Sequence, residues 1–180
     1  SGAYLAQLVA GTDSTRIPFV VRTRVSGSQA PILVQLATNT WEAYNRYGGK
    51  SLYGAHAPRL VGAAERVSFQ RPFWGPYDSI EYGLLWQYPF ISFLEQQGYQ
   101  YEVCTNYDVH SEPGLVDAYR LFVSIGHDEY YSKEMFDELE RSAETLEPPA
   151  ESLRPERRPV VERVAPELAV VGELLRRDAR

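Results

Sequence analysis

The sequence predicts an α/β domain with a mostly parallel sheet flanked by helices, and three observations predict it. Short apolar runs alternate with stretches of helical periodicity, as in folds whose helices connect parallel strands. Polar clusters directly follow two of the apolar runs, where sites form in such sheets. The pattern stops near Arg141, beyond which none of the 13 tyrosines, 7 phenylalanines or 3 tryptophans occurs. We therefore expect one domain over residues 1–140 and a different segment over residues 141–180.

The first elements are predicted to be strands. Residues 4–9 and 17–22 are expected to pair across a turn at residues 11–14, which is rich in turn-forming residues. The apolar run 32–36 is typical of a buried strand. Residues 41–45 are expected to add about one helical turn.

The middle of the chain is expected to hold a long loop, a helix and a strand. Residues 54–80 are rich in Gly, Pro and Ala and predict the loop. A helix is predicted over residues 81–97, with Pro89 breaking or restarting it. A strand is predicted over residues 99–105.

The last elements of the domain are two helices around a strand. A short helix is predicted over residues 111–118, with Pro113 near its start. The strand is expected at residues 121–125. Ser132 is predicted to cap a final helix that runs through Leu139.

Charge and cysteine content exclude several classes of function. The net charge is −6 and no basic stripe occurs, so nucleic acid is not an expected partner. No run reaches the roughly 18 apolar residues of a membrane-spanning helix. A single cysteine, Cys104, allows neither an intrachain disulfide nor a thiolate metal cluster, and it fits a cytoplasmic protein. We expect that thiol to be buried and inert.

Residues 141–180 contain five prolines, eight arginines and eight acidic residues but no lysine. Such a segment seldom builds a core, so we expect it to be disordered or to form a short helix. Its composition is also that of a shifted reading frame in a GC-rich gene. An uninterrupted frame in the source DNA, with no family-like continuation in a neighbouring frame, would contradict that hypothesis.

Two segments that follow buried strands carry the candidate chemistry, residues 38–45 and residues 126–132. In the second, His127–Tyr131 are five consecutive titratable residues, and buried carboxylates must be paired, hydrogen-bonded or bound to a cation. The alternative stays open that the acids only complement the start of the following helix. No Gly-x-Ser-x-Gly motif indicates a serine hydrolase, and Gly48–Ser51 lacks the upstream glycine of a P-loop.

Several of these segments together resemble one known family, that of the C-terminal region of the large subunit of N,N-dimethylformamidase and its relatives. The resemblance extends from Ser1 to about Glu138. The matching stretches, in chain order, are residues 1–6, 17–22, 39–45, 48–53, 67–69, 71–72 and 126–130.

The resemblance implies a glutamine-amidotransferase-like fold of the flavodoxin-like three-layer type, here truncated at its C-terminal end. It also implies a mononuclear Fe(III) ion held by Tyr4, Tyr44 and Glu129, with His127 as a base or an orienting residue. Fe(III) is a hard cation suited to oxygen ligands, and it polarises carbonyls and acidifies bound water. The implied activity is hydrolysis of C–N bonds in small amides.

Three further residues are weaker candidates for contacting the substrate or supporting the ligands: Asn45, Lys50 and Asp128. For Asn45 and Lys50, stabilisation of a turn is the favoured interpretation. The expected partners are a small-molecule amide and either a small subunit or further copies of this chain. The sequence departs from the family in two places, with Tyr131 where the motif usually has Trp, and from Arg141 onward, where nothing resembles the family.

Two other functions stay open for this chain. The first is a non-catalytic binding or scaffold module, and the second is an inactive fragment of such an enzyme. Colour separates the binding module from the enzyme, because ferric tyrosinate absorbs visible light and an empty binding module does not. Metal binding without cleavage of an amide would favour the inactive fragment.

Overall fold

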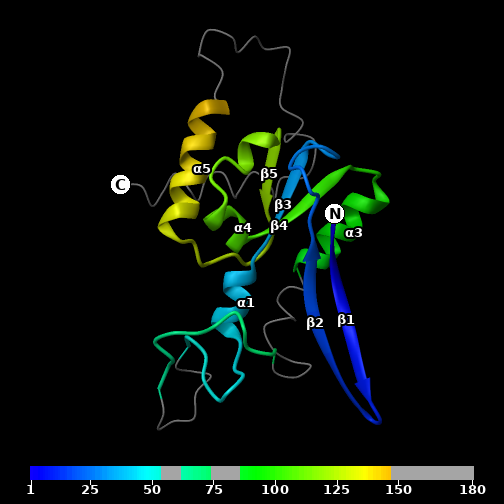
Figure 1. Cartoon of the computed structure of the whole chain (residues 1–180), viewed down its shortest axis with the longest axis vertical. Coiled ribbons are helices and arrows are strands. Elements are labelled where there is room, and N and C mark those ends of the chain that lie inside the picture. The colour runs from blue at the N-terminus through cyan, green and yellow to red at the C-terminus, as the bar shows by residue number, and fades with distance from the viewer. Residues whose placement is uncertain (54–61, 74–85, 147–180) are drawn as a thin grey trace. The chain divides into compact units, whose positions relative to one another are not determined.

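The computed structural model describes residues 1–53, 62–73 and 86–146 (Figure 1). Its contacts divide the chain into one unit from Ser1 to Ser142 and another from Ala143 to Arg180. Most of the predicted tail, and the parts of the predicted 54–80 loop and 81–97 helix at residues 54–61 and 74–85, lie outside the described residues.

The chain begins with an antiparallel hairpin. Strand β1, Gly2–Ala10, pairs with β2, Asp13–Val21, over their full length. Gly11 in the turn has φ of +63°, a conformation that glycine adopts without strain. The two predicted strands are confirmed, with β1 extended at both ends. The predicted turn at residues 11–14 is shorter than expected, because β2 already begins at Asp13.

A three-stranded parallel sheet forms the centre of this unit. Its order is β4 (Tyr101–Thr105), β3 (Ile32–Leu36) and β5 (Leu121–Ser124). The bounds predicted for β3 are confirmed, and those of β4 and β5 differ by one or two residues at one end. The mixed α/β class with parallel strands is also confirmed, while the specific flavodoxin-like arrangement stays a prediction.

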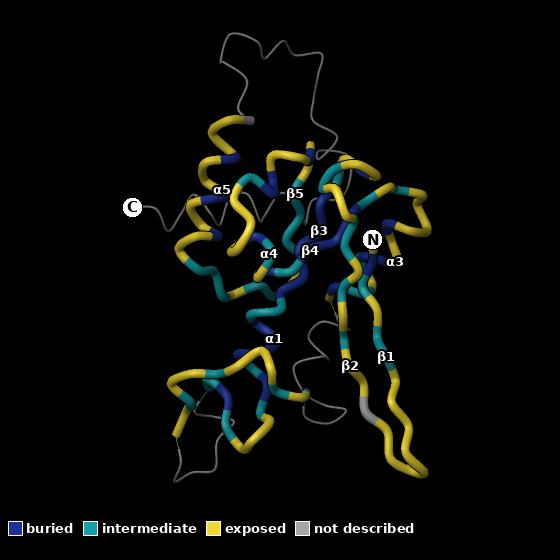
Figure 2. Tube along the Cα trace, viewed as in Figure 1, coloured by how far each residue is buried: buried dark blue, intermediate teal, exposed yellow. Residues whose placement is uncertain are grey.

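Helices cover both faces of this sheet, because neighbouring residues of a strand point to opposite faces. On one face Leu33 and Cys104 pack with α4 (Asn106–Ser111), the 3-10 helix Val116–Ala118 and α5 (Lys133–Leu146). On the other face lie α1 (Thr38–Tyr44) and α3 (Tyr88–Gln96), in a cluster with these buried residues: Val34, Leu36, Trp41, Ile91, Leu94, Val103 and Ile125. Figure 2 shows the buried positions concentrated along the central strands.

The predicted helix over residues 111–118 is wrong. The chain instead forms α4 before Ser111 and a separate 3-10 helix after it. The cause is the end of β4, where the Thr105 side chain accepts from the backbone N–H of Asp108 and the Asp108 carboxylate accepts from the backbone N–H of Thr105. This capping box starts α4 five residues early.

The remaining helix predictions hold with small changes. Pro89 lies in the first turn of α3, where its missing N–H costs nothing. The Ser132 hydroxyl accepts from the backbone N–H of Met135, which confirms it as the cap of α5. That helix continues through Arg141 to Leu146. No helix in the described part of the chain has the length and apolarity to cross a membrane.

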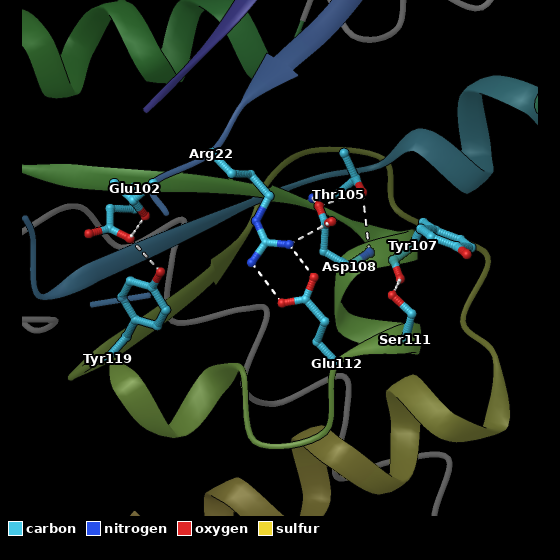
Figure 3. Close-up of polar contacts among 9 residues, drawn as sticks. Arg22, Glu102, Thr105, Tyr107, Asp108, Ser111, Glu112 and Tyr119 are labelled. Carbon is cyan, nitrogen blue, oxygen red and sulfur yellow. Dashed lines mark hydrogen bonds and ion pairs between the residues drawn. The ribbon is translucent and has the colours of Figure 1, made fainter. Parts of the chain in front are cut away.

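A buried carboxylate anchors the segment between β2 and β3. Glu102 on β4 is 1% exposed and accepts hydrogen bonds from the Thr23 hydroxyl and, at 2.5 Å, from the Tyr119 hydroxyl. It also accepts from the backbone N–H groups of Gly27 and Gln29, at 3.2 and 2.8 Å. Figure 3 shows the contact between Glu102 and Tyr119. These bonds fix the chain as it leaves the hairpin for the sheet.

An arginine ties the end of the hairpin to α4. The Arg22 guanidinium lies 2.8 Å from Asp108 and makes two hydrogen bonds to Glu112, of 2.5 and 2.9 Å (Figure 3). This fork geometry is the strong form of an arginine–carboxylate pair. It lowers the pKa of Glu112, chiefly through the hydrogen bond from Arg22.

Candidate functional site

The candidate site forms where β5 ends and the chain passes beside α1, as expected for a parallel sheet. Residues 126–131 follow β5, and the first turn of α1 holds them in two places. The backbone N–H of Glu129 donates to the Thr40 hydroxyl at 2.9 Å. The Asn39 side-chain amide donates to the carbonyl of Tyr130, also at 2.9 Å. Segments about ninety residues apart in sequence are thereby joined.

Four side chains gather around the carboxylate of Glu129, and together with Glu129 they form a set of five residues that we call the Glu129 cluster: Tyr44, Tyr53, His127, Glu129 and Tyr130. The Tyr53 hydroxyl donates to one carboxylate oxygen, Oε2. His127 Nε2 lies 2.5 Å from Oε1, and the Tyr44 hydroxyl lies 3.5 Å from it, at the limit of hydrogen bonding. The Tyr130 hydroxyl donates to that of Tyr53 at 2.8 Å. The cluster is therefore rich in oxygen atoms that converge on one carboxylate.

The two phenols nearest Glu129 hold each other in place. The rings of Tyr44 and Tyr53 stack with centroids 4.2 Å apart. The ring of His127 lies 5.7 Å from that of Tyr44. Stacking of this kind adds to the packing of aromatic rings and limits their rotation.

The cluster favours an ionised carboxylate beside protonated phenols. Partial burial alone would raise the pKa of Glu129, but hydrogen bonds from Tyr53 and His127 outweigh it and lower the pKa. Partial burial and donation to Glu129 both raise the pKa of Tyr53. In the absence of a cation, Tyr53 therefore keeps its proton and shares it with Glu129.

The contact between His127 and Glu129 fixes a proton on the histidine. An ionised carboxylate can only accept, so Nε2 of His127 is the donor in this contact. A base that takes a proton from water must therefore use Nδ1, or must first leave Glu129. This geometry favours an orienting role for His127 as long as the contact with Glu129 persists.

Tyr4, the third ligand implied by the resemblance, lies elsewhere. It is on β1, 47% exposed, with its ring stacked on Phe19 across the hairpin at 5.5 Å. Among the described residues, the structure brings Tyr44, His127 and Glu129 together but does not bring Tyr4 to them.

Asn45 and Lys50 belong to the loop after α1. Asn45 is fully buried; its amide donates to the carbonyl of Pro72 at 3.1 Å, and its Oδ1 accepts from the N–H of Tyr47. These contacts match the turn-stabilising interpretation. The carbonyl of Lys50 accepts from the Arg71 guanidinium at 3.2 Å, so the backbone at this position is held as well.

Asp128 lies between His127 and Glu129 in the sequence, but its side chain contacts other residues than theirs. Its carboxylate accepts from Gln35 on β3, Asn106 on α4 and Ser124 on β5. Asp128 thus contacts the ends of the sheet, while His127 and Glu129 contact the tyrosines.

A cleft of about 260 Å³ opens beside the cluster. Tyr130 belongs both to its wall and, through its hydroxyl, to the cluster. The other lining residues are Asn39, Glu42, Leu52, Val67, Phe69, Tyr131 and Ser132. The volume is below the range of drug-sized pockets, so the cleft suits a smaller molecule.

The chemistry of the donors fits a hard cation. Within residues 1–53, 62–73 and 86–146, no three or more His, Cys, Asp or Glu side chains gather in a way that could hold a metal. A site here would therefore rest on Glu129 and on phenols. A bound cation of high charge removes the proton of a phenol, which makes Tyr44 and Tyr53 suitable anionic donors.

Sequence reasoning missed Tyr53, Tyr130 and Thr40 as members of the site. Tyr53 ends the Gly48–Tyr53 stretch that resembles the family, and this position was a usable signal. The contact between Thr40 and the backbone of Glu129 had no signal, because it joins residues 89 positions apart.

Comparison with models of known protein families gives a match. The model of a family described as N,N-dimethylformamidase beta subunit-like, C-terminal, matches residues 1–145. No curated protein matches the chain.

Proposed function

The chain belongs to the N,N-dimethylformamidase beta subunit-like, C-terminal family, and on this premise we propose that it hydrolyses the C–N bond of small amides at a mononuclear Fe(III) site. The family match makes the domain dimethylformamidase-like. The reaction, the metal and the residues that serve them are our proposal.

The observation that carries the proposal is the convergence of oxygen donors on Glu129. Tyr44 and Glu129, both ligands by resemblance, lie within 3.5 Å of each other at the carboxyl ends of the strands. We propose them as ligands. The resemblance gives Tyr4 as the second phenol, and the structure offers Tyr53 beside Glu129. Iron content of Tyr4→Phe and Tyr53→Phe variants decides between the two.

Fe(III) in this position would polarise the amide carbonyl and lower the pKa of water. The side chains of the chain supply the remaining functions. Glu129 provides negative charge, and Tyr53 holds the oxygen of Glu129 that faces away from His127. His127 orients Glu129 and, through Nδ1, accepts the proton of the attacking water and passes it to the departing amine.

The cleft beside the cluster supports a small substrate. Its wall combines apolar side chains, such as Leu52 and Val67, with the polar groups of Asn39 and Tyr130. Apolar walls suit the alkyl groups of a substituted amide, and a few polar groups suffice to orient its carbonyl.

A partner subunit is part of the proposal. The description of the family refers to a beta subunit, which supports assembly with a second kind of chain; assembly with further copies of this chain is the other arrangement we propose to test. We place the enzyme in the cytoplasm, where its one thiol, Cys104, stays reduced.

Amine release tests the function directly. The protein is loaded with ferric nitrilotriacetate, desalted and incubated with N,N-dimethylformamide and simple primary amides, and the released dimethylamine or ammonia is quantified. Glu129→Ala should abolish release, while Glu140→Ala, which removes an exposed acid of α5, should leave it unchanged. If the iron-loaded protein released no amine from any of these amides, the binding module or inactive fragment would be favoured.

A further inference from the structure

Asp128 lies between His127 and Glu129, two members of the Glu129 cluster, yet its own hydrogen bonds are to residues outside that cluster. We propose that Asp128 is a positioning residue that fixes the backbone at Glu129 and thereby the direction of the Glu129 and His127 side chains. Its expected effect on iron rests on the proposed function, whereas its effect on the backbone does not.

The Asp128 carboxylate accepts hydrogen bonds from four side chains. Gln35 Nε2 donates at 2.7 Å and Asn106 Nδ2 at 3.1 Å. The hydroxyls of Ser124 and Tyr131 donate at 2.8 and 2.9 Å. A carboxylate can only accept, and in this arrangement the Asp128 carboxylate provides an acceptor for each of these four groups.

Three of these donors come from the ends of the three parallel strands. Gln35 lies on β3, Asn106 begins α4 directly after β4, and Ser124 ends β5, so all three parallel strands contribute. Gln35 and Asn106 are fully buried. Donors fixed in the sheet leave the Asp128 carboxylate one place to lie, and moving it would strand several buried polar groups.

The backbone at Glu129 connects Asp128 to the Glu129 cluster. Glu129 follows Asp128 directly, and its N–H donates to the Thr40 hydroxyl at 2.9 Å. Asp128 on the sheet side and Thr40 on α1 therefore hold the same backbone unit from two directions. With that unit held, Glu129 meets the hydroxyl of Tyr53, and His127 meets Glu129.

Tyr131 offers a way to weaken this arrangement by removing a single hydroxyl. That hydroxyl reaches both Asp128 and Ser124, at 2.9 and 3.0 Å. Replacing this ring by Phe removes one donor from Asp128 without changing the shape of the core. Tyr131→Phe is thus a milder change than Asp128→Asn, because it removes one donor and leaves the Asp128 carboxylate in place.

The test compares Asp128→Asn and Tyr131→Phe with Glu102→Gln. Glu102 is a matched control, because it is another carboxylate with four donors, but it lies near the start of β4, away from the strand ends that hold Asp128. Amide hydrogen exchange is followed at Glu129, Val34 and Val103, and binding of ferric nitrilotriacetate is followed by its visible absorption.

We expect Asp128→Asn to increase exchange at Glu129 by about tenfold or more while Val34 and Val103 stay protected. Tyr131→Phe should give a smaller increase at the same amide, which keeps the test valid if Asp128→Asn does not fold. In Glu102→Gln, amide exchange at Glu129 should rise by no more than exchange at Val34 and Val103. Iron binding should weaken about 10- to 100-fold in Asp128→Asn, as for other residues that orient a ligand.

Unchanged exchange at Glu129 in both variants, or exchange that rises equally at Glu129 and throughout the sheet, would overturn the positioning role. Absence of iron binding in the unmodified protein would instead count against the proposed function, and the exchange result would still decide the role of Asp128.

Discussion

The hydroxyl of Tyr53 donates a hydrogen bond to the carboxylate of Glu129, joining residues 76 positions apart in the sequence. The carboxylate thus has a donor at each oxygen, with Tyr53 at Oε2 and His127 at Oε1. Such a carboxylate is held ionised and in one orientation before any ligand arrives. Preorganised charge of this kind is what a metal site or a polar reaction centre requires.

Tyr53→Phe should raise the pKa of Glu129, because the hydrogen bond that Tyr53 donates lowers it. The pKa is measured by ¹³C NMR titration of the Glu129 carboxyl group. Tyr47→Phe is the control, since Tyr47 is an exposed tyrosine in the same loop region. An unchanged Glu129 pKa in Tyr53→Phe would show that the contact does not persist in solution.

Glu102→Gln should destabilise the protein by about 2 kcal/mol at neutral pH, the value of a hydrogen-bonded buried charge. Burial alone would raise the pKa of Glu102, but hydrogen bonds from Thr23, Tyr119, Gln29 and Gly27 lower it below its ordinary 4.5.

The pH dependence of this effect follows from the sign of the shift. A lowered pKa in the folded protein gives stability that is fully present above pH 4.5 and is lost as the pH falls through the folded value. Urea unfolding at about pH 7 and about pH 3 should therefore show a difference between the two proteins that shrinks in acid. A difference that grew in acid would contradict this account of Glu102.

Cys104 should not react with a thiol reagent in the native protein. The residue is fully buried, and burial raises the pKa of its thiol well above the ordinary value. Reaction should proceed only as fast as the protein unfolds, and should be complete in concentrated urea. Rapid reaction under native conditions would mean that the helices on this face of the sheet do not pack as described.

Thr105→Ala should destabilise the protein by about 1 kcal/mol through loss of the cap of α4. Its hydroxyl accepts from Asp108, and the reverse bond from the Thr105 N–H cannot replace it. Thermal unfolding measures the loss. Thr12→Ala, in the exposed turn of the hairpin, serves as control and should be close to neutral.

The sequence was sufficient to predict the strands and the segments that form the candidate site. The run Ile32–Leu36 is apolar on both faces because helices cover both, and that property is visible in the residues themselves. Placement of His127–Glu129 after the carboxyl end of a strand followed from the rule for parallel sheets, although that strand, β5, was expected to be buried and none of its four residues is. The position of α4 was also readable, since Thr105 and Asp108 have the spacing of a capping box, but Pro113 drew the prediction further along the chain.

The partners within the site were not readable from the sequence, because they depend on contacts between distant segments. Tyr53 reaches Glu129 only after the loop that follows α1 has folded back, and Arg71 helps to hold that loop at the carbonyl of Lys50. Gln35 did carry a signal, as a polar residue within a buried strand, although its partner Asp128 lies 93 positions away. The location of Tyr4 on the hairpin followed from the strand predicted at residues 4–9, but the stacking of its ring on Phe19 had no local signal.

Iron content of the purified protein tests the central claim most directly, measured by elemental analysis after loading with ferric nitrilotriacetate, beside Glu129→Ala and Glu140→Ala. The account predicts about one equivalent of iron in the unmodified protein and in Glu140→Ala, with visible absorption from coordinated tyrosinate, and none in Glu129→Ala. Iron that is absent from the unmodified protein, or retained by Glu129→Ala, would contradict it.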